Sequence, residues 1–523
     1  MSSVPASAPP TVSVLFLTPA AEPPPPDPLD RAALEDLNLD QLVGALARRR
    51  PSYDLAPTVT RRLTDPDAVA YRQEVFRDLD RDEVREAVDR FCTGMLRLRR
   101  FRSLAGSRQA PAERRSWHLH AGRVYVEAVT RLAADLAALE VRSRALTRLH
   151  GYLEHLLASP PFRTLADDTE RLHRDLSAVR YRLHLVPQGV EVLPDGRDDE
   201  DDPDLTAALT TTFAAFLPDG GPGPSREPRR AAALTHLEAQ ILDRVAELEP
   251  ETFAALERYA DGHPDPVDPA VLAFDRDVQF YLAYLEHIAP LRRAGLPFCE
   301  PTVTRGGGPP VLRETFDPLL ADKLLTEGAR PVGNSLALAD HERLVVVTGA
   351  NQGGKTTFAR TLGQVHHLAS LGCPVPGREV ALTLPDRILT HFAREERLAD
   401  RHGRLQDDLL RMRAVLDAAS ADSLVILNEL FRSTTIVDAQ VLGRRILDRL
   451  AGIGALTVYV TFIDELATRG PETVSLVATV DPDDAALRTF RLERRPADGR
   501  AHAAALAERH GLTYEAIRAR HRA

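Results

Sequence analysis

The sequence predicts a multidomain protein in which an all-α region is followed by an α/β domain with a largely parallel sheet. The chain has 523 residues, a length that usually makes about two to four domains. Apolar residues recur at three- and four-residue steps from about residue 30 to 185 and again from 234 to 291, which indicates helices. After the Gly- and Pro-rich stretch 306–310 the pattern becomes strand, Gly-rich loop, helix, strand, helix, strand. That alternation is typical of a parallel sheet.

The composition excludes several classes of protein. The net charge is −10, so no basic coat for nucleic acid covers the whole molecule. No apolar run reaches the roughly 18 to 20 residues of a membrane span, which excludes an integral membrane protein. The three cysteines lie far apart, which excludes a disulfide framework and a Cys-rich zinc site. We therefore expect a protein of the reducing cytoplasm.

The first half of the chain is expected to be an arm followed by helices. Residues 1–29 are rich in Pro, Ser and Ala, and we expect them to form a disordered arm. The helical region runs from residue 30 to about 305. Within it, one leucine stripe predicts a single long helix. The stripe consists of Leu132, Leu136, Leu139, Leu146, Leu149, Leu153 and Leu156.

A small insert is expected within the helical region, near residues 180–228. Apolar and other residues alternate over 181–193, which predicts a β-hairpin. The acidic run 198–202 and the Pro/Gly-rich stretch 218–228 predict solvated loops.

The strongest local signal is a phosphate-binding loop in residues 345–357. The sequence VVVTGANQGGKTT contains the pattern G-x-x-x-x-G-K-[ST], with a β-branched strand before it and a helical pattern after it. Its glycines let backbone N–H groups approach a polyphosphate, and the N-terminus of the following helix favours negative charge. Lys355 is expected to reach the β- and γ-phosphates, and the Thr356 hydroxyl to bind Mg²⁺. We therefore expect a nucleoside triphosphate here.

The choice of basic residues also singles out Lys355. Of 66 basic residues only Lys323 and Lys355 are lysine. A lysine that persists against such a bias indicates a position that needs a compact ammonium group.

Two further strands are expected to end beside this loop. The apolar run 423–427 is followed by Asn428 and Glu429, in the form of a Walker B element, where one residue supports Mg²⁺ and the next orients the attacking water. Asn428 adds no negative charge, so we expect weaker Mg²⁺ binding, and Glu429 is the candidate base. The strand 456–460 ends in Thr461, a candidate polar contact to the nucleotide.

These motifs resemble the ATPase domain of the MutS family of DNA mismatch repair proteins. Residues 348–357 (TGANQGGKTT) are similar to the family's T-G-P-N-M-G-G-K-S-T. Residues 423–435 (SLVILNELFRSTT) are similar to S-L-V-L-M-D-E-I-G-R-G-T-S. The segment 330–334 resembles the stretch that leads the counterpart of Asn334 to the nucleotide, and 497–517 resembles the family's closing helices.

The resemblance implies both a fold and a function. The fold is a helical core and lever-arm region over 30–305, then an ABC-ATPase-like P-loop NTPase domain with closing C-terminal helices over 306–523. The chain is expected to be a short, divergent member without the mismatch-reading domain and the Smr domain. The implied function is ATP hydrolysis in a homodimer whose nucleotide-driven opening and closing acts in DNA repair or recombination. DNA and repair proteins are the implied partners.

The sequence also departs from the family pattern. Asn428 stands where the family has Asp, Phe462 where it has His, and Gly403-Arg404 where a signature serine reaches the partner's nucleotide. These losses favour an alternative, a nucleotide-gated interaction protein that binds ATP, hydrolyses it slowly or not at all, and holds a protein partner. Retention of Lys355, Thr356 and Glu429 favours the ATPase.

The predicted site combines the motif residues with those that the resemblance adds. The catalytic residues are Lys355 and Glu429, and Mg²⁺ is expected on Thr356 and Asn428. A positive contact to the γ-phosphate is expected from Arg404 or Arg432 of the partner subunit. The residues expected to bind ATP are Asn334, Gly349, Asn351, Gly353, Gly354, Lys355, Thr356, Thr357, Asn428 and Thr461.

A basic stretch, residues 97–115, has two interpretations. It carries seven arginines against one acid, Glu113. Such a stretch contacts nucleic-acid phosphates without reading sequence, or it is a solvated helix face in an arginine-rich chain. The acidic run 198–202 would repel DNA. The expectation of DNA binding therefore rests mainly on the family resemblance.

Overall fold

The computed structural model describes residues 12–18, 22–107, 110–186, 189–194, 236–306, 308–393, 403–481, 487–497 and 518. The chain forms two compact units. Unit 1 comprises residues 1–85, 141–149 and 273–523, and unit 2 comprises 86–140 and 150–272. Across the described ranges, no helix combines the length and the apolar character that a membrane crossing requires.

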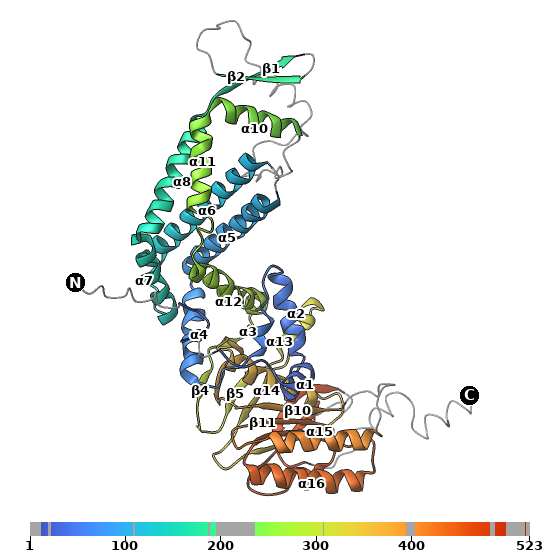
Figure 1. Ribbon diagram of the computed structural model, residues 1–523. Coiled ribbons are helices and arrows are strands. Elements are labelled where there is room, and N and C mark those ends of the chain that lie inside the picture. Colours follow the sequence, from blue (N-terminus) through green and yellow to red (C-terminus); the bar gives the residue numbers. More distant parts are fainter. Residues whose placement is uncertain are drawn as a thin grey trace, which may run out of the picture. The chain divides into compact units, whose positions relative to one another are not determined.

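Unit 1 contains a six-stranded sheet, whose strands β10 and β11 are labelled in Figure 1. Its order is β10-β11-β12-β7-β13-β14, and all neighbours are parallel except β13 and β14. Every residue of β11 is buried, as expected for a parallel strand covered on both faces. The strands are β7 (Leu344–Gly349), β10 (Ile388–Phe392), β11 (Leu424–Asn428), β12 (Leu456–Val460), β13 (Thr473–Val480) and β14 (Arg488–Arg494).

Helices accompany this sheet and cover one of its edges. They include α13 (Pro318–Thr326), α14 (Lys355–Ser370), α15 (Arg404–Ala418), α16 (Ile436–Ile453) and the short 3₁₀ helix η2 (Asp464–Ala467). The edge strand β10 is fully buried because α1 (Pro28–Asp36) packs along it. The Thr390 hydroxyl on β10 donates to Asp36 Oδ2 over 2.7 Å. An edge strand covered in this way cannot pair with a strand of another chain.

Unit 1 also contains a smaller, four-stranded sheet, which carries Asn334. Its order is β4-β9-β5-β6, with β4 and β9 parallel and the other pairs antiparallel. Its strands are β4 (Thr302–Thr304), β5 (Val311–Thr315), β6 (Asn334–Ala337) and β9 (Glu379–Thr383), and a separate pair joins β3 (Phe298–Cys299) to β8 (Val375–Pro376).

Part of the arm expected to be disordered is packed into unit 1. Residues 12–17 (VSVLFL) place Val14 and Leu15 in the core. Three donors hold the carbonyls of this segment: Tyr71 Oη on Ser13 O (2.7 Å), Arg72 Nε on Leu15 O (3.0 Å) and Tyr281 Oη on Val14 O (2.5 Å). The burial of its apolar side chains offsets the entropy cost of ordering the segment. The Pro-rich average composition of residues 1–29 hides this short apolar run. The first helix also begins earlier than expected, at Pro28, where Asp27 caps it.

Unit 1 contains further helices. They are α2 (Leu39–Arg49), α3 (Ala56–Thr60) and α4 (Pro66–Leu79), together with the unit 1 parts of α7 (Arg144–Ala158) and α12 (Pro269–Arg293).

Unit 2 is a helical unit with a small hairpin. Its helices include α5 (Asp82–Ser107), α6 (Pro111–Ala138), α8 (Pro160–Ala178), α10 (His236–Leu248) and α11 (Pro250–Gly262). Helices α6, α8 and α11 pack together where Gly122 leaves room for the Tyr259 ring, whose hydroxyl bonds Thr169 Oγ1 over 3.0 Å. The hairpin of β1 (Tyr181–Val186) and β2 (Gly189–Pro194) confirms the expectation for 181–193.

The prediction of one long helix through the leucine stripe is wrong. Helix α6 ends at Ala138, and α7 begins at Arg144. The buried carboxylate of Asp78 accepts from the backbone N–H groups of Arg142 and Ser143, over 3.0 and 2.7 Å to Oδ2. A carboxylate on backbone N–H groups just before a helix acts as a cap, so it favours a new helix start here. Leucine spacing cannot reveal a cap supplied from 64 residues upstream.

The coarse fold class is confirmed: a helical N-terminal region precedes an α/β domain with a mixed, mostly parallel sheet. The acidic run 198–202, the stretch 218–228 and the closing helices beyond residue 497 lie outside the described residues.

Candidate functional site

The predicted phosphate-binding loop joins β7 to α14 at the carboxyl edge of the large sheet. Gly349 has φ +99°, and a Cβ there would lie 2.7 Å from Ala478 O on β13. Gly354 has φ +89° directly before α14. Both positions therefore require glycine, for close approach and for left-handed backbone. The loop delivers the N-terminus of a 16-residue helix to the site.

Lys355 lies folded into this loop. Its Nζ donates to Gly349 O (2.6 Å), Ala350 O (3.3 Å) and Asn351 Oδ1 (3.2 Å). Burial lowers the pKa of its ammonium group, and the charges of Glu429 and Asp464 oppose that shift. Within the described residues, the hydrogen-bond acceptors of this ammonium are all neutral, and an anionic phosphate oxygen can replace them with a gain in Coulomb energy.

The two residues expected to hold Mg²⁺ lie in contact. The Thr356 hydroxyl donates to Asn428 Oδ1 over 3.0 Å, at the carboxyl end of β11. Both are neutral oxygen ligands, and the described residues hold no group of three or more His, Cys, Asp or Glu that could bind a metal. Mg²⁺ commonly keeps several waters and binds through few protein oxygens plus substrate phosphates. The donor set therefore fits Mg²⁺ that arrives with a nucleotide and does not fit Mg²⁺ alone.

Glu429 follows in an unusual backbone conformation. Its φ is +52°, and its N–H donates to Val460 O of β12 over 2.8 Å. The side chain forms an ion pair with Arg432 of the same chain, 2.9 Å from Nη1 to Oε2. A left-handed residue that is not glycine is strained and persists where the surroundings over-determine it. The base candidate is thus fixed in position, and its carboxylate is engaged by Arg432.

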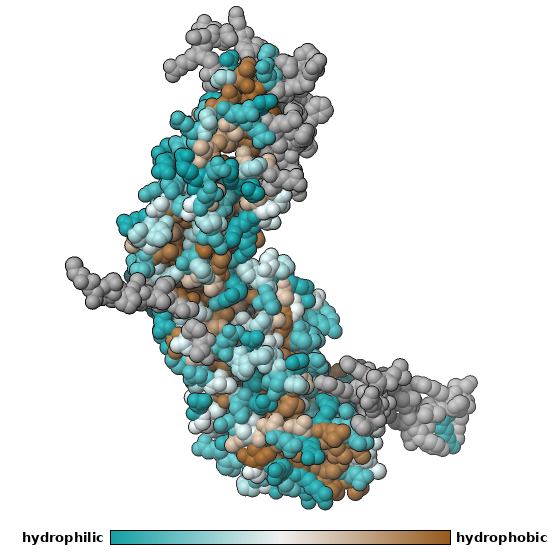
Figure 2. All heavy atoms as spheres, in the orientation of Figure 1, coloured by the Kyte–Doolittle hydropathy of each residue, from teal (hydrophilic) through white to brown (hydrophobic). Residues whose placement is uncertain are grey.

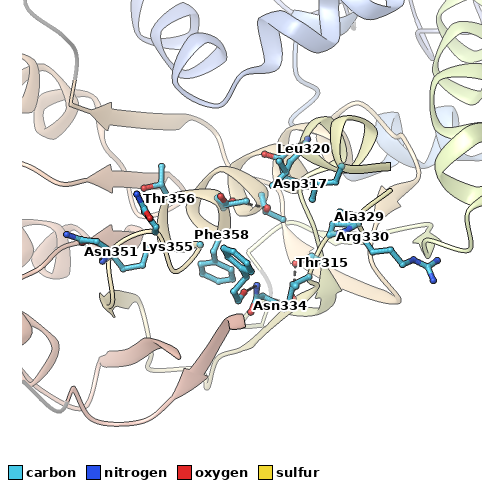
Figure 3. Close-up of a pocket in the computed structure, with 18 of the residues that line it drawn as sticks. Thr315, Asp317, Leu320, Ala329, Arg330, Asn334, Asn351, Lys355, Thr356 and Phe358 are labelled. Carbon is cyan, nitrogen blue, oxygen red and sulfur yellow. Dashed lines mark hydrogen bonds between the residues drawn. The ribbon is translucent and has the colours of Figure 1, made fainter. Parts of the chain in front are cut away.

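A cavity of about 640 Å³ opens beside the loop. Its wall away from the loop is largely apolar, and includes Leu320, Leu324, Pro331 and Val332. Figure 3 shows Asn351, Lys355 and Thr356 on one side, Thr315, Ala329 and Arg330 on the other, and Phe358 and Asn334 between them. A cavity of this size with polar groups at one end suits a nucleoside phosphate.

Asn334 contributes to the cavity by holding β14. Its Nδ2 donates to Phe490 O (3.0 Å), and its Oδ1 accepts from Leu492 N (2.8 Å). Phe490 has φ +57°, is 49% exposed and lines the cavity. The amide thus fixes an exposed aromatic ring beside Gly354.

The predicted residues differ in where the structure places them. Asn334, Asn351, Gly354, Lys355, Thr356, Thr357 and Glu429 line the cavity. Gly349 and Gly353 shape the loop, and Asn428 reaches the site through Thr356. Thr461 does not line the cavity, because it is buried and its Oγ1 accepts from Ile463 N over 3.1 Å. Gly403 and Arg404 lie at the start of α15, and the Arg404 side chain is outside the described part.

Sequence reasoning missed several cavity residues. Phe490 lies 135 residues after Lys355 in the chain, on a strand with no motif of its own, and Arg330 and Asp317 precede the loop. Only the family resemblance around Asn334 gave a signal that residues before the loop reach the site. Arg432 was expected to act from the partner subunit, and here it contacts Glu429 of its own chain.

The basic stretch of unit 2 is partly neutralised. Arg102 forms an ion pair with Asp265 over 3.2 Å, and Arg115 pairs with Glu257. Arg97 and Arg100 are exposed and form no ion pair within the described residues. Residue 108 lies outside the described part. The structure is therefore compatible with both interpretations of the stretch, with fewer free arginines than the sequence shows.

Comparison with known proteins identifies the α/β domain. Residues 345–489 match the family model of MutS domain V. A DNA mismatch repair protein MutS of a Synechococcus species is 28% identical over 228 residues, 43% of this chain and 24% of the relative. The MutS of Brevibacillus brevis is 31% identical over 173 residues, 31% of this chain and 20% of the relative. DNA mismatch repair protein MutS 2 of Halobacterium salinarum is 31% identical over 149 residues, which are 28% of this chain and 17% of the relative.

The matched part therefore spans less than a quarter of the length of each of these relatives. The likeness to MutS proteins lies in the domain that holds the phosphate-binding loop.

Proposed function

We propose that this chain binds ATP with Mg²⁺ and hydrolyses it as a MutS-like ATPase. The observation that carries the proposal is the meeting of four side chains at one edge of the sheet. Lys355 and Thr356 come from the loop, and Asn428 and Glu429 come from the end of β11. These groups lie beside a cavity of nucleotide size, and the domain matches MutS domain V.

The mechanism follows from the hydrogen bonds that the site residues form. Lys355 exchanges its loop carbonyls for phosphate oxygens, and the N–H groups at the start of α14 bind the same anion. Thr356 and Asn428 would hold Mg²⁺, which would supply positive charge against the negative charge that develops during phosphoryl transfer. Glu429 orients the attacking water once its carboxylate is released from Arg432. Arg432 is then free to approach the γ-phosphate.

An apolar surface supports a homodimer. Ile436, Val437 and Val441 of α16 are 66%, 69% and 48% exposed, and Phe462 lies 44% exposed after β12. Leu409 and Leu410 on α15 are also exposed. Figure 2 shows brown surface over this part of unit 1. Clustered exposed apolar residues of this kind mark an interaction surface more often than a free one.

DNA repair or recombination is the proposed setting, in the cytoplasm. The relatives that match the domain are named DNA mismatch repair proteins. In this proposal DNA binding alters turnover, the nucleotide cycle opens and closes the dimer, and repair proteins act as further partners.

A second function is favoured by two observations at the site. Asn428 gives the metal position no negative charge, and Glu429 is held by Arg432. Both features slow hydrolysis while leaving phosphate binding intact. The alternative is therefore a nucleotide-gated interaction protein that hydrolyses ATP slowly or not at all and holds a protein partner.

Steady-state ATP hydrolysis of the full chain, with and without duplex or branched DNA, separates the two functions. A DNA-dependent rate that Lys355→Ala abolishes supports the ATPase. ATP binding without any Lys355-dependent turnover, under every DNA condition, refutes the ATPase and favours the switch.

A further inference from the structure

A second cavity lies at the opposite, amino edge of the large sheet. Its volume is about 320 Å³, within the usual range for small-ligand sites. Residues just before or at the start of β7, β11 and β12 line it, together with the end of β9 and the turn at Pro309 and Pro310. No residue of this cavity lines the cavity at the phosphate-binding loop. Helix α14 contributes to both, with Lys355 at its start and His366 three turns later.

His366 presents one unused nitrogen to this cavity. The residue is 1% exposed, and its Nδ1 lies 2.8 Å from Leu362 O. A carbonyl only accepts, so Nδ1 carries the proton and Nε2 carries a lone pair. Nε2 forms no hydrogen bond within the described part of the chain. It is also not one of the unpaired side-chain atoms there that are fully shielded from solvent. Burial lowers the pKa of His366 to about 4, which keeps the ring neutral and the lone pair free.

Arg343 presents a positive charge that forms no ion pair with the residues that the structure describes. It lies half-buried directly before β7. Its backbone N–H donates to Glu472 O, and its carbonyl accepts from Thr457 N, so its backbone is fixed. Its Nη1 donates to Glu342 O over 3.0 Å, a neutral acceptor. Of the lining residues, Asp422 alone is a carboxylate; it is exposed and forms no ion pair with Arg343. A half-buried guanidinium that meets no carboxylate favours an anion from solution.

Thr383 lines the cavity, and its hydroxyl is occluded behind the wall and unpaired in the described structure. This threonine ends β9. An unpaired buried hydroxyl is costly, so a ligand oxygen that bonds it gains free energy. Rotation about χ1 is enough to turn a threonine hydroxyl toward a neighbouring ligand.

We propose that this cavity binds a small hydroxylated anion. A carboxylate or phosphate group accepts from Arg343 and Thr383, and a hydroxyl of the same molecule donates to His366 Nε2. The cavity offers a neutral acceptor, His366 Nε2, as well as a cation, Arg343. An anion without a hydroxyl group would leave His366 Nε2 without a donor, so the site favours an anion that also carries a hydroxyl. Hydroxycarboxylates and phosphorylated polyols share this chemistry. The proposal is independent of ATP binding at the loop.

The test is calorimetric titration of the full chain with glycerol 3-phosphate, L-malate, inorganic phosphate and glycerol. We expect one site with a Kd of about 0.1–1 mM for glycerol 3-phosphate or malate, typical for a ligand of this size. If malate binds more tightly, the ligand is a hydroxycarboxylate; if glycerol 3-phosphate does, the ligand is a phosphorylated polyol. Inorganic phosphate is expected to bind more weakly, and glycerol not at all.

Two variants and two controls assign the binding to this cavity. Arg343→Met is expected to weaken it roughly 10-fold or more, since it removes a charged hydrogen bond, and the isosteric Thr383→Val about 2- to 10-fold. Arg445→Met, on an exposed arginine of α16 outside the cavity, is the matched control and keeps full affinity. Lys355→Ala keeps it too, because the phosphate-binding loop is not involved.

Two outcomes overturn the proposal. One is the absence of saturable binding by both hydroxylated anions. The other is binding that Lys355→Ala removes and that Thr383→Val and Arg343→Met leave unchanged, which places the anion in the phosphate-binding loop. Thr383→Val keeps the test decisive if Arg343→Met lowers the melting temperature too far for titration, because valine preserves the shape of the side chain.

Discussion

The phosphate-binding loop of unit 1 and the basic stretch 97–115 of unit 2 both carry positive charge, but they hold it differently. Lys355 is buried, and in the described part of the chain its ammonium donates to neutral loop oxygens. Arg102 and Arg115 lie on helices and already meet carboxylates. A buried charge with neutral partners gains most from an incoming anion, whereas an exposed ion pair is worth little and is screened by salt. Substitutions in the first region should therefore affect function far more than those in the second.

The largest expected effect is that of Glu429→Gln. It removes the carboxylate that orients water, so we expect turnover to fall about 10²- to 10³-fold while ATP affinity stays within a factor of about two. Single-turnover hydrolysis and equilibrium ATP binding measure the two effects. Glu465→Gln, in the neighbouring helix η2, is the control and should change neither. An equal loss in both variants contradicts the role of Glu429.

A backbone substitution gives the next largest effect. Gly354→Ala places a side chain at φ +89°, which costs about 1–2 kcal/mol in left-handed backbone. We expect ATP affinity to fall about 10-fold because the loop shifts. The control is Gly452→Ala in α16, where φ is ordinary and nothing lies near the added Cβ. Titration with a fluorescent nucleotide compares the two, and equal affinity in both shows that the loop geometry does not matter.

The metal position offers a gain-of-function test. Asn428→Asp puts a carboxylate 3.0 Å from the Thr356 hydroxyl, and a negative ligand binds Mg²⁺ more strongly. The Mg²⁺ concentration needed for half-maximal ATP binding should fall about 3- to 10-fold. Affinity for ATP in EDTA should fall or stay constant, since no metal offsets the added charge. An unchanged Mg²⁺ requirement excludes residue 428 from the metal site.

The smallest effect is expected in unit 2. Arg102→Gln and Arg115→Gln remove arginines that are paired with carboxylates, so duplex DNA affinity should change less than about 2-fold at fixed salt. Arg97→Gln and Arg100→Gln are the informative partners, since these arginines are exposed and unpaired in the described structure. If the stretch contacts phosphates, each lowers the slope of log K against log salt by about 0.9. An unchanged slope in all four variants makes the stretch a solvated helix face.

The sequence predicted the loop region well because local chemistry dictates it. Glycines at 349 and 354 are needed for left-handed backbone, and a β-branched strand and a helix flank them. The ends of β7 and β11 meet because parallel strands align their carboxyl ends. The contact between Thr356 and Asn428 follows from that alignment.

Other features depend on residues far apart in the chain, which a pattern within one segment cannot reveal. The break between α6 and α7 depends on Asp78, and the burial of residues 12–17 depends on donors of α4 and α12. Phe490 reaches the site because Asn334 holds the backbone of β14 from another sheet. The Thr461 Oγ1 accepts from Ile463 N at the end of its strand, a contact that the strand pattern does not reveal, and its contact to the nucleotide stays a prediction.

The most direct test of the account is the affinity of the full chain for ATP, with and without Mg²⁺, measured by calorimetry beside Lys355→Ala. The account predicts micromolar binding that Mg²⁺ strengthens and that Lys355→Ala weakens at least about 100-fold, because a buried charge–phosphate contact is lost. Equal affinity of the two proteins for ATP, or no binding by either, contradicts the assignment of the loop as the nucleotide site.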